Sequence, residues 1–341
     1  MKYVIGIDGG GTKTLCAAAS ADGEVLKVYK TGCTNPYISG LEQTRAYIAE
    51  AVETLVNNLG VSPGDISNVY MGLAGADNES DIRLLKQAFD TTLLKELPYE
   101  IENDIWIAYK AKTVENVGAV SVCGTGHNTG VLAPGNRKVY INAYKYPLGN
   151  FGGGRMITDM ALNDAFRSYE HTGDKTMLED RLCGHCGYSS WQQLAEDIIK
   201  SGYTLQYDFS VPKLVVELAK EGDAVSRRIL ETAGWEQGRM TGGLIEKAGL
   251  CNARIPIVLS GTIYVTDDSG YLLNSYKESV KRFCPHSAIQ LLDGEPVQGA
   301  LINAIEHSNE GLDSEELYMI SKRINETMTR YFMSEGEDSN V

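Results

Sequence analysis

The sequence predicts an α/β protein of two domains, each of which opens with the same kind of glycine-bearing hairpin. The length of 341 residues suggests two domains with ample core. The start of the chain reads as three strands in succession. A glycine- and threonine-rich turn joins the first two strands, and a tight turn joins the second to the third. The same order recurs from Gly124, 115 residues after Gly9. Apolar strands and helical patterns follow each hairpin, which is typical of an α/β sheet.

The first hairpin is the strongest candidate for a ligand site. A β-branched run ends in one aspartate and three glycines, and a second apolar run follows. Glycines let the backbone approach a ligand, and their N–H groups can form an anion cradle. An aspartate at a strand end can hold a hydrated divalent cation, which usually bridges to nucleotide phosphates. The candidate binding residues are Asp8, Gly9, Gly10, Gly11, Thr12, Lys13 and Thr14.

Three simpler interpretations compete with this one. A glycine hairpin can be only a turn. A Walker A loop needs lysine where Thr12 stands, and the Rossmann pattern needs glycine where Thr14 stands. Both motifs also open a helix, whereas a strand follows here. The second hairpin, with Gly124, Thr125 and Gly126 at its tip, argues against a plain turn, because two such hairpins could clamp one polyphosphate between two domains.

Together, the two hairpins resemble the phosphate motifs of the actin-like ATPase superfamily of sugar kinases and actin. Within it, the chain resembles the BadF/BadG/BcrA/BcrD group, in which the best-understood members are N-acetylglucosamine kinases. The resemblance runs from Tyr3 to about His307. It implies two ribonuclease H-like domains around a nucleotide cleft, with ATP and Mg²⁺ as cofactors. It also implies that Asp8 orders the metal through a water molecule.

Two loops of the first domain are candidates for sugar binding. Thr34 and Asn35 follow the third strand and precede a helix predicted over residues 41–59. Gly75 lies in a small-residue loop between a strand and a helix, where an open α/β sheet has its cleft. The simpler interpretations are a helix-capping turn and an ordinary connecting loop. The resemblance implies that both loops contact the sugar.

Asp104 is the candidate catalytic residue. It follows the strand 99–102 and precedes a short helical pattern, so Asn103 or Asp104 could simply cap that helix. Phosphoryl transfer needs a hydroxyl aligned with the γ-phosphorus, and a carboxylate can align it and accept its proton. The resemblance implies that Asp104 is this base and also contacts the sugar.

The second domain contains one departure from the group and one weaker motif. Kinases of this group usually have an acidic pair where Asn150 and Phe151 stand. Asn150 can still accept a hydrogen bond from a substrate, but the charge is lost. Gly261 and Thr262 end an apolar strand and resemble the adenosine motif, in which a second glycine usually takes the place of Thr262.

The domain boundaries follow from these motifs. The first domain is predicted over residues 1–117 and the second over 118–313, with a hinge and no flexible linker between them. A last amphipathic helix over 314–333 is predicted to return to the first domain. A homodimer is a further hypothesis.

Composition argues against several classes of partner. The net charge of −14 disfavours nucleic acid and anionic membranes, which need basic surfaces. No apolar run approaches the ~18–20 residues of a membrane span. Seven cysteines without a signal peptide indicate free thiols and a cytoplasmic protein. Cys183 and Cys186 are predicted to be free thiols in a polar loop, because no further zinc-ligand pair accompanies them.

Three functions are compatible with the sequence. The leading one is ATP-dependent phosphorylation of an amino sugar, most simply N-acetylglucosamine to its 6-phosphate. The second is an activator ATPase of the same group, although no cysteine lies in the glycine-rich context of an iron–sulfur site. The third is a regulatory nucleotide-binding module without kinase activity, for which the replacement at Asn150 and Phe151 is the motive.

Overall fold

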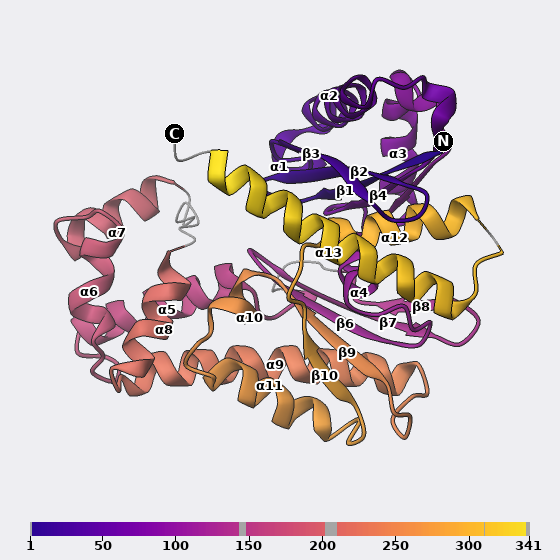
Figure 1. Cartoon of the computed structure of the whole chain (residues 1–341). Coiled ribbons are helices and arrows are strands. Elements are labelled where there is room, and N and C mark those ends of the chain that lie inside the picture. The colour runs from indigo at the N-terminus through magenta and orange to yellow at the C-terminus, as the bar shows by residue number, and fades with distance from the viewer. Residues whose placement is uncertain (1, 143–147, 202–209, 310, 339–341) are drawn as a thin grey trace. The chain divides into compact units, whose positions relative to one another are not determined.

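The computed structural model describes residues 2–142, 148–201, 210–309 and 311–338, with side chains up to 334 (Figure 1). The chain forms two compact units. The first consists of residues 1–116 and 292–341, and the second of residues 117–291. The predicted second domain ended at residue 313, but residues 292–313 belong to the first unit. The reason is that helix α12 (Pro296–Ser308) packs on the sheet of the first unit.

The first unit contains a mixed five-stranded sheet in the order β3-β2-β1-β4-β5. β1, β2 and β3 form the predicted antiparallel hairpins, while β4 and β5 pair in parallel with β1 and β4. Parallel pairs need a crossover, and helices α2 and α3 supply it for β4 and β5. The strands span Tyr3–Gly9 (β1), Thr14–Ser20 (β2), Val25–Thr31 (β3), Ile66–Leu73 (β4) and Tyr99–Glu102 (β5).

Helices cover both faces of this sheet. Alternate residues of β1 and β2 point to opposite sides. One set packs with α2 and α3, and the other packs with α12 and α13. Short 3₁₀ turns precede β4 and β5. The helices are α1 (Pro36–Ser39), α2 (Leu41–Leu59), α3 (Glu79–Phe89), α4 (Asp104–Lys112), α12 (Pro296–Ser308) and α13 (Ser314–Asp338), and the 3₁₀ turns are Pro63–Asp65 and Leu93–Glu96.

Helix α12 approaches β1 and α4 so closely that only glycine fits at two contacts. A Cβ atom at Gly6 would lie 2.7 Å from the backbone nitrogen of Leu301. A Cβ atom at Gly299 would lie 1.9 Å from the carbonyl oxygen of Ile107. These contacts join residues nearly 200 to 300 positions apart, so local sequence patterns give no sign of them. They explain why α12 belongs to the first unit.

Helix α13 packs on the β2–β3 hairpin of the first unit, as predicted for the last helix. The guanidinium of Arg323 forms ion pairs with Asp22 and Glu24 in the hairpin turn. The Thr327 hydroxyl accepts a hydrogen bond from the backbone N–H of Val25 at 3.1 Å. The helix is longer than the predicted 314–333 and extends to Asp338.

The second unit repeats the strand order of the first. Its sheet runs β8-β7-β6-β9-β10, with antiparallel hairpins on one side and parallel strands on the other. Two sheets of the same order confirm the predicted fold class. The strands span Gly118–Cys123 (β6), His127–Ala133 (β7), Arg137–Tyr140 (β8), Pro256–Ser260 (β9) and Ala288–Leu291 (β10).

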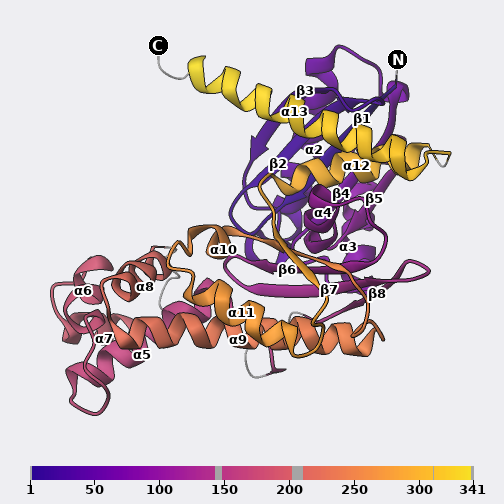
Figure 2. The same ribbon diagram turned by 60° about the horizontal axis from the view of Figure 1, so that its bottom comes forward.

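Helices of the second unit bury one large apolar core, with α11 lying along α9 (Figure 2). Glycines 234, 238 and 242 of α9 allow this close approach, since each lacks a Cβ that would strike α11 or Phe283 just beyond it. The helices are α5 (Gly154–Tyr169), α6 (Leu178–His185), α7 (Trp191–Lys200), α8 (Val211–Lys220), α9 (Ala224–Lys247), α10 (Thr262–Thr266) and α11 (Tyr271–Lys281).

The segment that carries Cys183 and Cys186 is not the polar loop that was predicted. Cys183 lies in α6, its side chain is buried, and its thiol donates a hydrogen bond to the carbonyl of Tyr188. Cys186 caps the end of the same helix. Leu178 and Leu182 pack inward on the face that also holds Cys183, so this prediction was wrong about the local structure. None of the described helices is long and apolar enough to cross a membrane.

Candidate active site

The glycine hairpin of the first unit places Asp8 at the carboxyl end of β1. The turn is closed by a hydrogen bond from the Gly10 N–H to the Lys13 carbonyl at 3.0 Å. Within the described residues, the N–H groups of Gly11 and Thr12 at the tip have no backbone acceptor. Thr12 and Lys13 are exposed. This hairpin therefore offers free backbone donors and one cation, which is what a phosphate cradle requires.

The base of the hairpin is packed against the loop that holds Thr34. The hydroxyls of Thr14 and Thr34 form a buried hydrogen bond of 2.7 Å. A Cβ at Gly9 would lie 2.4 Å from the Thr34 hydroxyl, so this position needs glycine. Both threonine side chains are fully buried. Thr14 and Thr34 thus support the hairpin from behind, and their hydroxyls are not accessible to a ligand.

The two loops predicted to bind sugar lie against each other. Asn35 caps α1 through a 2.9 Å hydrogen bond from the Tyr37 N–H to its Oδ1. Gly75 has a φ of +89°, and a Cβ there would lie 2.9 Å from the same oxygen. Asn35 and Gly75 are therefore neighbours at the carboxyl edge of the first sheet, and Gly75 keeps space beside the Asn35 amide.

Asp104 is the first residue of α4, and Asn103 is the residue that caps this helix. The Asn103 Oδ1 accepts a hydrogen bond from the Ile105 N–H at 3.2 Å. Because the capping role belongs to Asn103, the Asp104 carboxylate is available for other interactions. The Asp104 carboxylate also interacts with the backbone N–H groups of Asp104 and Ile105, which act to lower its pKa.

The acidic side chains at this edge influence one another. Burial, followed by the nearby charges of Asp104 and Glu295, raises the pKa of Asp8 to about 7, although Lys13 acts in the opposite direction. Burial, followed by the charge of Asp77, raises the pKa of Asp104 to about 7. Such shifts on partly buried acids at a sheet edge are typical of functional sites. Asp8 and Asp104 are thus brought together, as a metal ligand and a base in one site would require.

A magnesium ion fits the donor set at Asp8. Mg²⁺ usually keeps several waters and binds to one or two carboxylates together with phosphate oxygens. Asp8 supplies one carboxylate, and Glu295 at the start of α12 adds a second negative charge nearby. Among the described residues, no group of three or more His, Cys, Asp or Glu side chains could hold a metal alone. Asp8 and Glu295 would thus supply two negative charges toward a metal that takes its other ligands from water and phosphate.

The hairpin of the second unit is bonded to the start of α5. The Gly154 N–H donates to the Gly124 carbonyl at 2.8 Å, and the Arg155 N–H donates to the Thr125 carbonyl at 3.0 Å. A Cβ at Gly153 would lie 2.4 Å from the backbone of Gly126. The first N–H groups of α5 are thus occupied by the turn, and the helix holds the hairpin in shape.

Gly261 lies beside this hairpin in the second unit. It follows β9, has a φ of +106°, and would place a Cβ only 2.3 Å from the Cys123 carbonyl, just before Gly124. The predicted adenosine motif and the second phosphate motif therefore adjoin. Thr262 is exposed and begins α10 instead of ending the strand.

Neutral polar groups underlie the second hairpin. The Ser121 hydroxyl is hydrogen-bonded to His127 Nε2 at 2.9 Å and to the Tyr264 hydroxyl at 2.8 Å. Burial lowers the pKa of His127 to about 3, so its imidazole is neutral at physiological pH. These side chains come from β6, β7 and α10, and they fix the base of the turn without charge.

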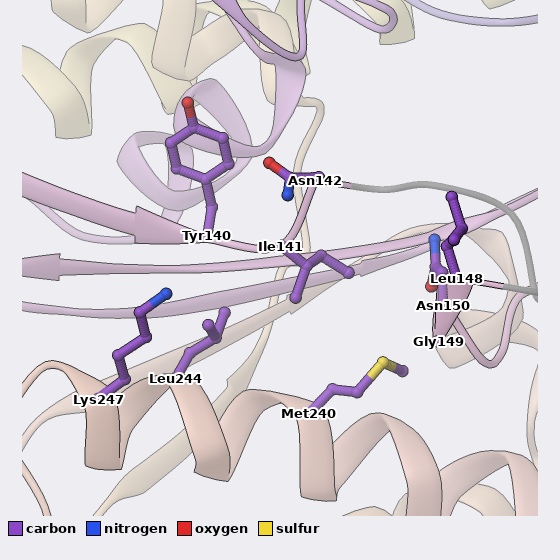
Figure 3. Close-up of a pocket in the computed structure, with 9 residues that line it drawn as sticks. All are labelled: Tyr140, Ile141, Asn142, Leu148, Gly149, Asn150, Met240, Leu244 and Lys247. Atoms are coloured by element: carbon purple, nitrogen blue, oxygen red, sulfur yellow. The ribbon is translucent and has the colours of Figure 1, made fainter.

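Asn150 lies beside a cavity of about 300 Å³ between α9 and the segment that precedes α5 (Figure 3). Its Nδ2 donates to the His127 carbonyl at 3.0 Å. Its Oδ1 is buried and has no hydrogen-bond partner among the described residues. A buried acceptor without a partner is costly unless a water or a ligand satisfies it. The cavity is lined by Tyr140, Ile141, Asn142, Leu148, Gly149, Asn150, Met240, Leu244 and Lys247.

Residues 5–302 match the model of the BadF/BadG/BcrA/BcrD ATPase family. The match covers most of the chain and includes both hairpins, Asp104 and Gly261. The chain belongs to the BadF/BadG/BcrA/BcrD ATPase family. This confirms the resemblance seen in the hairpin motifs.

The chain is similar to two kinases, and each similarity covers nearly the whole length of the kinase. The chain is 27% identical over 308 residues to an N-acetylmuramic acid/N-acetylglucosamine kinase of Clostridium acetobutylicum, covering 89% of this chain and 98% of that protein. It is 26% identical over 320 residues to an N-acetyl-D-glucosamine kinase of Dictyostelium discoideum, covering 88% of this chain and 97% of that protein.

A solved structure shows the same fold. A candidate N-acetylglucosamine kinase from Chromobacterium violaceum superposes with a TM-score of 0.71 at 18% identity, covering 89% of this chain and 99% of that one. At 18% identity this similarity establishes a shared fold and nothing about activity. It agrees with the two sheets of identical strand order in the BadF/BadG/BcrA/BcrD protein described here.

Sequence reasoning missed two acidic residues of the site. Asp77 follows the small-residue loop of Gly75 and adds charge beside Asp104. Glu295 caps α12 and adds charge beside Asp8. The position of Asp77 after a parallel strand was a usable signal, because ligand sites lie outside the carboxyl ends of such strands. Glu295 is distant in sequence, and nothing near it points to Asp8.

Proposed function

We propose that this protein transfers the γ-phosphoryl group of ATP to an amino sugar, most simply N-acetylglucosamine, to give the 6-phosphate. The observation that carries the proposal is the placement of Asp104. It stands at the start of α4, free of the capping role, beside Asp8, with a pKa raised to about 7. A base with a pKa near the working pH is deprotonated in a substantial fraction of molecules and still has a high affinity for a proton. Family membership and the kinase relatives support the same activity.

In this proposal, the residues have separate roles. Asp104 accepts the proton of the sugar hydroxyl as its oxygen bonds to the γ-phosphorus and the bond to ADP breaks. Asn35 donates or accepts a hydrogen bond to a second sugar hydroxyl, and Gly75 keeps the space beside it open. Thr34 supports the loop from behind, since its buried hydroxyl is bonded to Thr14. The sugar is thus held mainly by side chains of the first unit.

The nucleotide is proposed to use backbone groups of both hairpins. In the Gly9–Lys13 turn, the N–H groups of Gly11 and Thr12 and the Lys13 cation would bind phosphates, and Gly124–Gly126 would bind them through the turn fixed on α5. Gly261 and Thr262 would lie along the adenosine. Asp8 would hold Mg²⁺ through water, and the metal would neutralise phosphate charge. Membership in a family described as ATPases supports ATP as the nucleotide.

One observation, the asparagine at position 150, supports a second function, that of an activator or regulatory ATP-binding protein. Asn150 replaces the usual acidic ligand, and its side chain is bonded to the His127 carbonyl. A protein that binds ATP for activation or regulation without phosphorylating a sugar would need no acidic ligand there. The buried Oδ1 has no partner among the described residues, and a sugar hydroxyl or a water would satisfy it, so it does not decide between the two functions.

The deciding experiment is a sugar panel with two readouts. ADP release and sugar phosphate formation would be measured with N-acetylglucosamine, N-acetylmuramic acid, glucosamine and glucose, using wild type and Asp8→Asn. We expect magnesium-dependent phosphorylation of at least one amino sugar, and its loss in the variant. ATP binding without phosphorylation of any of these sugars would reject the kinase proposal and support the regulatory one.

Two coarser properties accompany the proposal. All seven cysteines are free thiols in the structure, which agrees with a cytoplasmic enzyme. The homodimer stays a prediction that light scattering of the purified protein would test.

A further inference from the structure

Asp77 is bonded to the residue that caps the helix of Asp104. Its Oδ1 accepts a hydrogen bond from Asn103 Nδ2 at 2.7 Å. The other end of the same amide, Oδ1, accepts the Ile105 N–H at 3.2 Å and caps α4. One side chain therefore holds the first turn of α4 at one end and Asp77 at the other. In the chain, Asp104 lies between Asn103 and Ile105, the two residues joined by the capping hydrogen bond.

Asp77 is also held from the opposite side. Its backbone N–H donates to Asp81 Oδ2 at 3.2 Å. The Asp81 carboxylate accepts further hydrogen bonds from Asn78 Nδ2 at 2.7 Å and from the Tyr37 hydroxyl at 2.6 Å. The loop of Asp77 is thus anchored to α3 and α1. A shift of this loop would break several hydrogen bonds, so Asp77 is a fixed point for Asn103.

The charge of Asp77 is not needed for this hydrogen bond. An asparagine at position 77 would offer Asn103 an equivalent acceptor without a charge. Keeping a carboxylate here is costly, because burial and then the neighbouring Asp81 raise the pKa of Asp77 to about 6, despite the Asn103 bond. A costly charge beside a reactive group is a sign of function more than of folding. The charge acts on Asp104, where it raises the pKa.

We infer that Asp77 is a positioning residue for the proposed phosphoryl transfer: it orients the Asp104 carboxylate through Asn103 and keeps it a strong proton acceptor. The inference rests on the proposed function. Asp77 itself does not touch the reacting atoms in this account. The other charged groups at this edge are Asp8 on β1, Lys13 in the hairpin, Asp81 on α3 and Glu295 at the start of α12.

The test separates the hydrogen bond from the charge. Asn103→Ser keeps a capping oxygen for α4 and removes the donor to Asp77. Asp77→Asn keeps the acceptor and removes the charge. The matched control is Asp90→Asn, which alters an aspartate that accepts one hydrogen bond from Tyr99, near the other end of α3. For each, kcat and KM would be measured from pH 5 to 9 with the best sugar.

We expect Asn103→Ser to lower kcat about tenfold while KM for ATP stays unchanged, because the general base is misaligned. Asp77→Asn should retain most of kcat at high pH. Its acid limb of kcat/KM should move to lower pH by about half a unit or more, because Asp104 loses a neighbouring negative charge. Asp90→Asn should match wild type. A purely structural role would lower activity at every pH without moving the limb, and that result would overturn the inference.

A measurement without turnover keeps this inference separate from the proposed activity. The carboxyl ¹³C signal of Asp104, assigned from its loss in Asp104→Asn, would be titrated without metal in wild type and Asp77→Asn. A lower Asp104 pKa in Asp77→Asn supports the coupling, even if the sugar panel has rejected the kinase. An unchanged pKa overturns the inference, even if wild type proves to be an active kinase.

Discussion

The hairpin of the first unit ends among carboxylates, whereas the hairpin of the second unit ends among neutral groups. Asp8 and Asp104 both have raised pKa values, because each is buried and lies near other negative charges. In the second unit, Ser121, His127 and Tyr264 form a neutral hydrogen-bonded base below the turn. Both hairpins nevertheless belong to sheets of the same strand order.

The difference shows that a duplicated fold supplies a place for chemistry without determining which chemistry occurs there. The first unit concentrates negative charge, which suits a metal and a proton acceptor. In the second unit the conformation of the hairpin turn is fixed instead, because the start of α5 forms backbone hydrogen bonds with Gly124–Gly126. We therefore expect substitutions in the first unit to change rate and sugar affinity, and substitutions in the second to change fold stability and nucleotide binding.

The largest expected effect is that of Asp104→Asn. Loss of a general base typically lowers kcat by about 10² to 10⁴. KM for ATP should remain near the wild-type value, since Asp104 has no proposed nucleotide contact. Steady-state kinetics with the preferred sugar would test this. A kcat within threefold of wild type would exclude Asp104 as the base.

The second hairpin can be tested with two glycines of similar backbone conformation. Gly153 has a φ of +84° and Gly149 a φ of +88°, but only Gly153 lies against another backbone, that of Gly126. Gly153→Ala should lower the free energy of unfolding by about 2–4 kcal/mol and weaken ATP binding. Gly149→Ala carries the backbone strain alone and should cost about 1 kcal/mol. Denaturant unfolding and nucleotide titration would compare them; equal losses would show that the Gly126 contact is unimportant.

Asn35→Ala sharpens the assignment of the sugar to the first unit. Removing a hydrogen bond to a sugar hydroxyl typically costs about 1–3 kcal/mol in binding. KM for the sugar should rise accordingly, with a smaller change in kcat. Asn35→Ser keeps a capping oxygen for α1 and loses the amide, so it should show the same rise. A normal KM in Asn35→Ser would assign Asn35 to capping only.

The smallest expected effect is a gain of stability in Asp8→Asn without Mg²⁺. The pKa of Asp8 is raised from 3.8 to about 7 in the folded protein, so wild type loses stability as the pH rises from about 4 to about 7. The variant escapes this loss and should be more stable at pH 7.5 by about 1–2 kcal/mol, a modest figure because Asp8 keeps contact with solvent. The gain should shrink toward pH 4 in thermal melts.

A control of opposite sign accompanies this prediction. The pKa of the exposed Asp65 is lowered by its hydrogen bonds with Ser62, so its charge is favourable. Asp65→Asn should therefore not stabilise the protein at pH 7.5. A gain of stability in both variants would trace the effect to net charge and not to the Asp8 site.

The parts predicted correctly from the sequence are those with local causes. A β-branched run ending at Asp8 and a second one ending before Gly124 identified both hairpins, because strands and glycine turns depend on neighbouring residues. The helix predicted at 41–59 has the observed bounds, since its apolar spacing and final Gly60 are local signals. Asp104 was placed correctly just after the end of a strand. That Asn103 and not Asp104 caps the following helix could be seen only in the structure.

The parts that were missed depend on contacts between distant residues. The affiliation of α12 rests on Gly299 against Ile107, and the support of the second hairpin rests on Tyr264 against Ser121. The position of Asp77 after a parallel strand was a local signal that was not used, whereas its contact with Asn103, 26 residues away, needed the structure. The loop predicted around Cys183 was wrong because polar residues on the outer face of α6 concealed a helix.

The two-part construction of the first unit has a consequence for how the protein is made. Val4 and Leu15 on one face of its sheet pack with Ile107 of α4 and with α12 and α13, which follow the second unit in the chain. The second unit, residues 117–291, is continuous and complete before those helices leave the ribosome. The apolar core of the first unit therefore needs segments from both sides of the second unit before it is complete. A polypeptide that ends before residue 292 lacks α12 and α13 and therefore leaves much of this apolar sheet face without its cover.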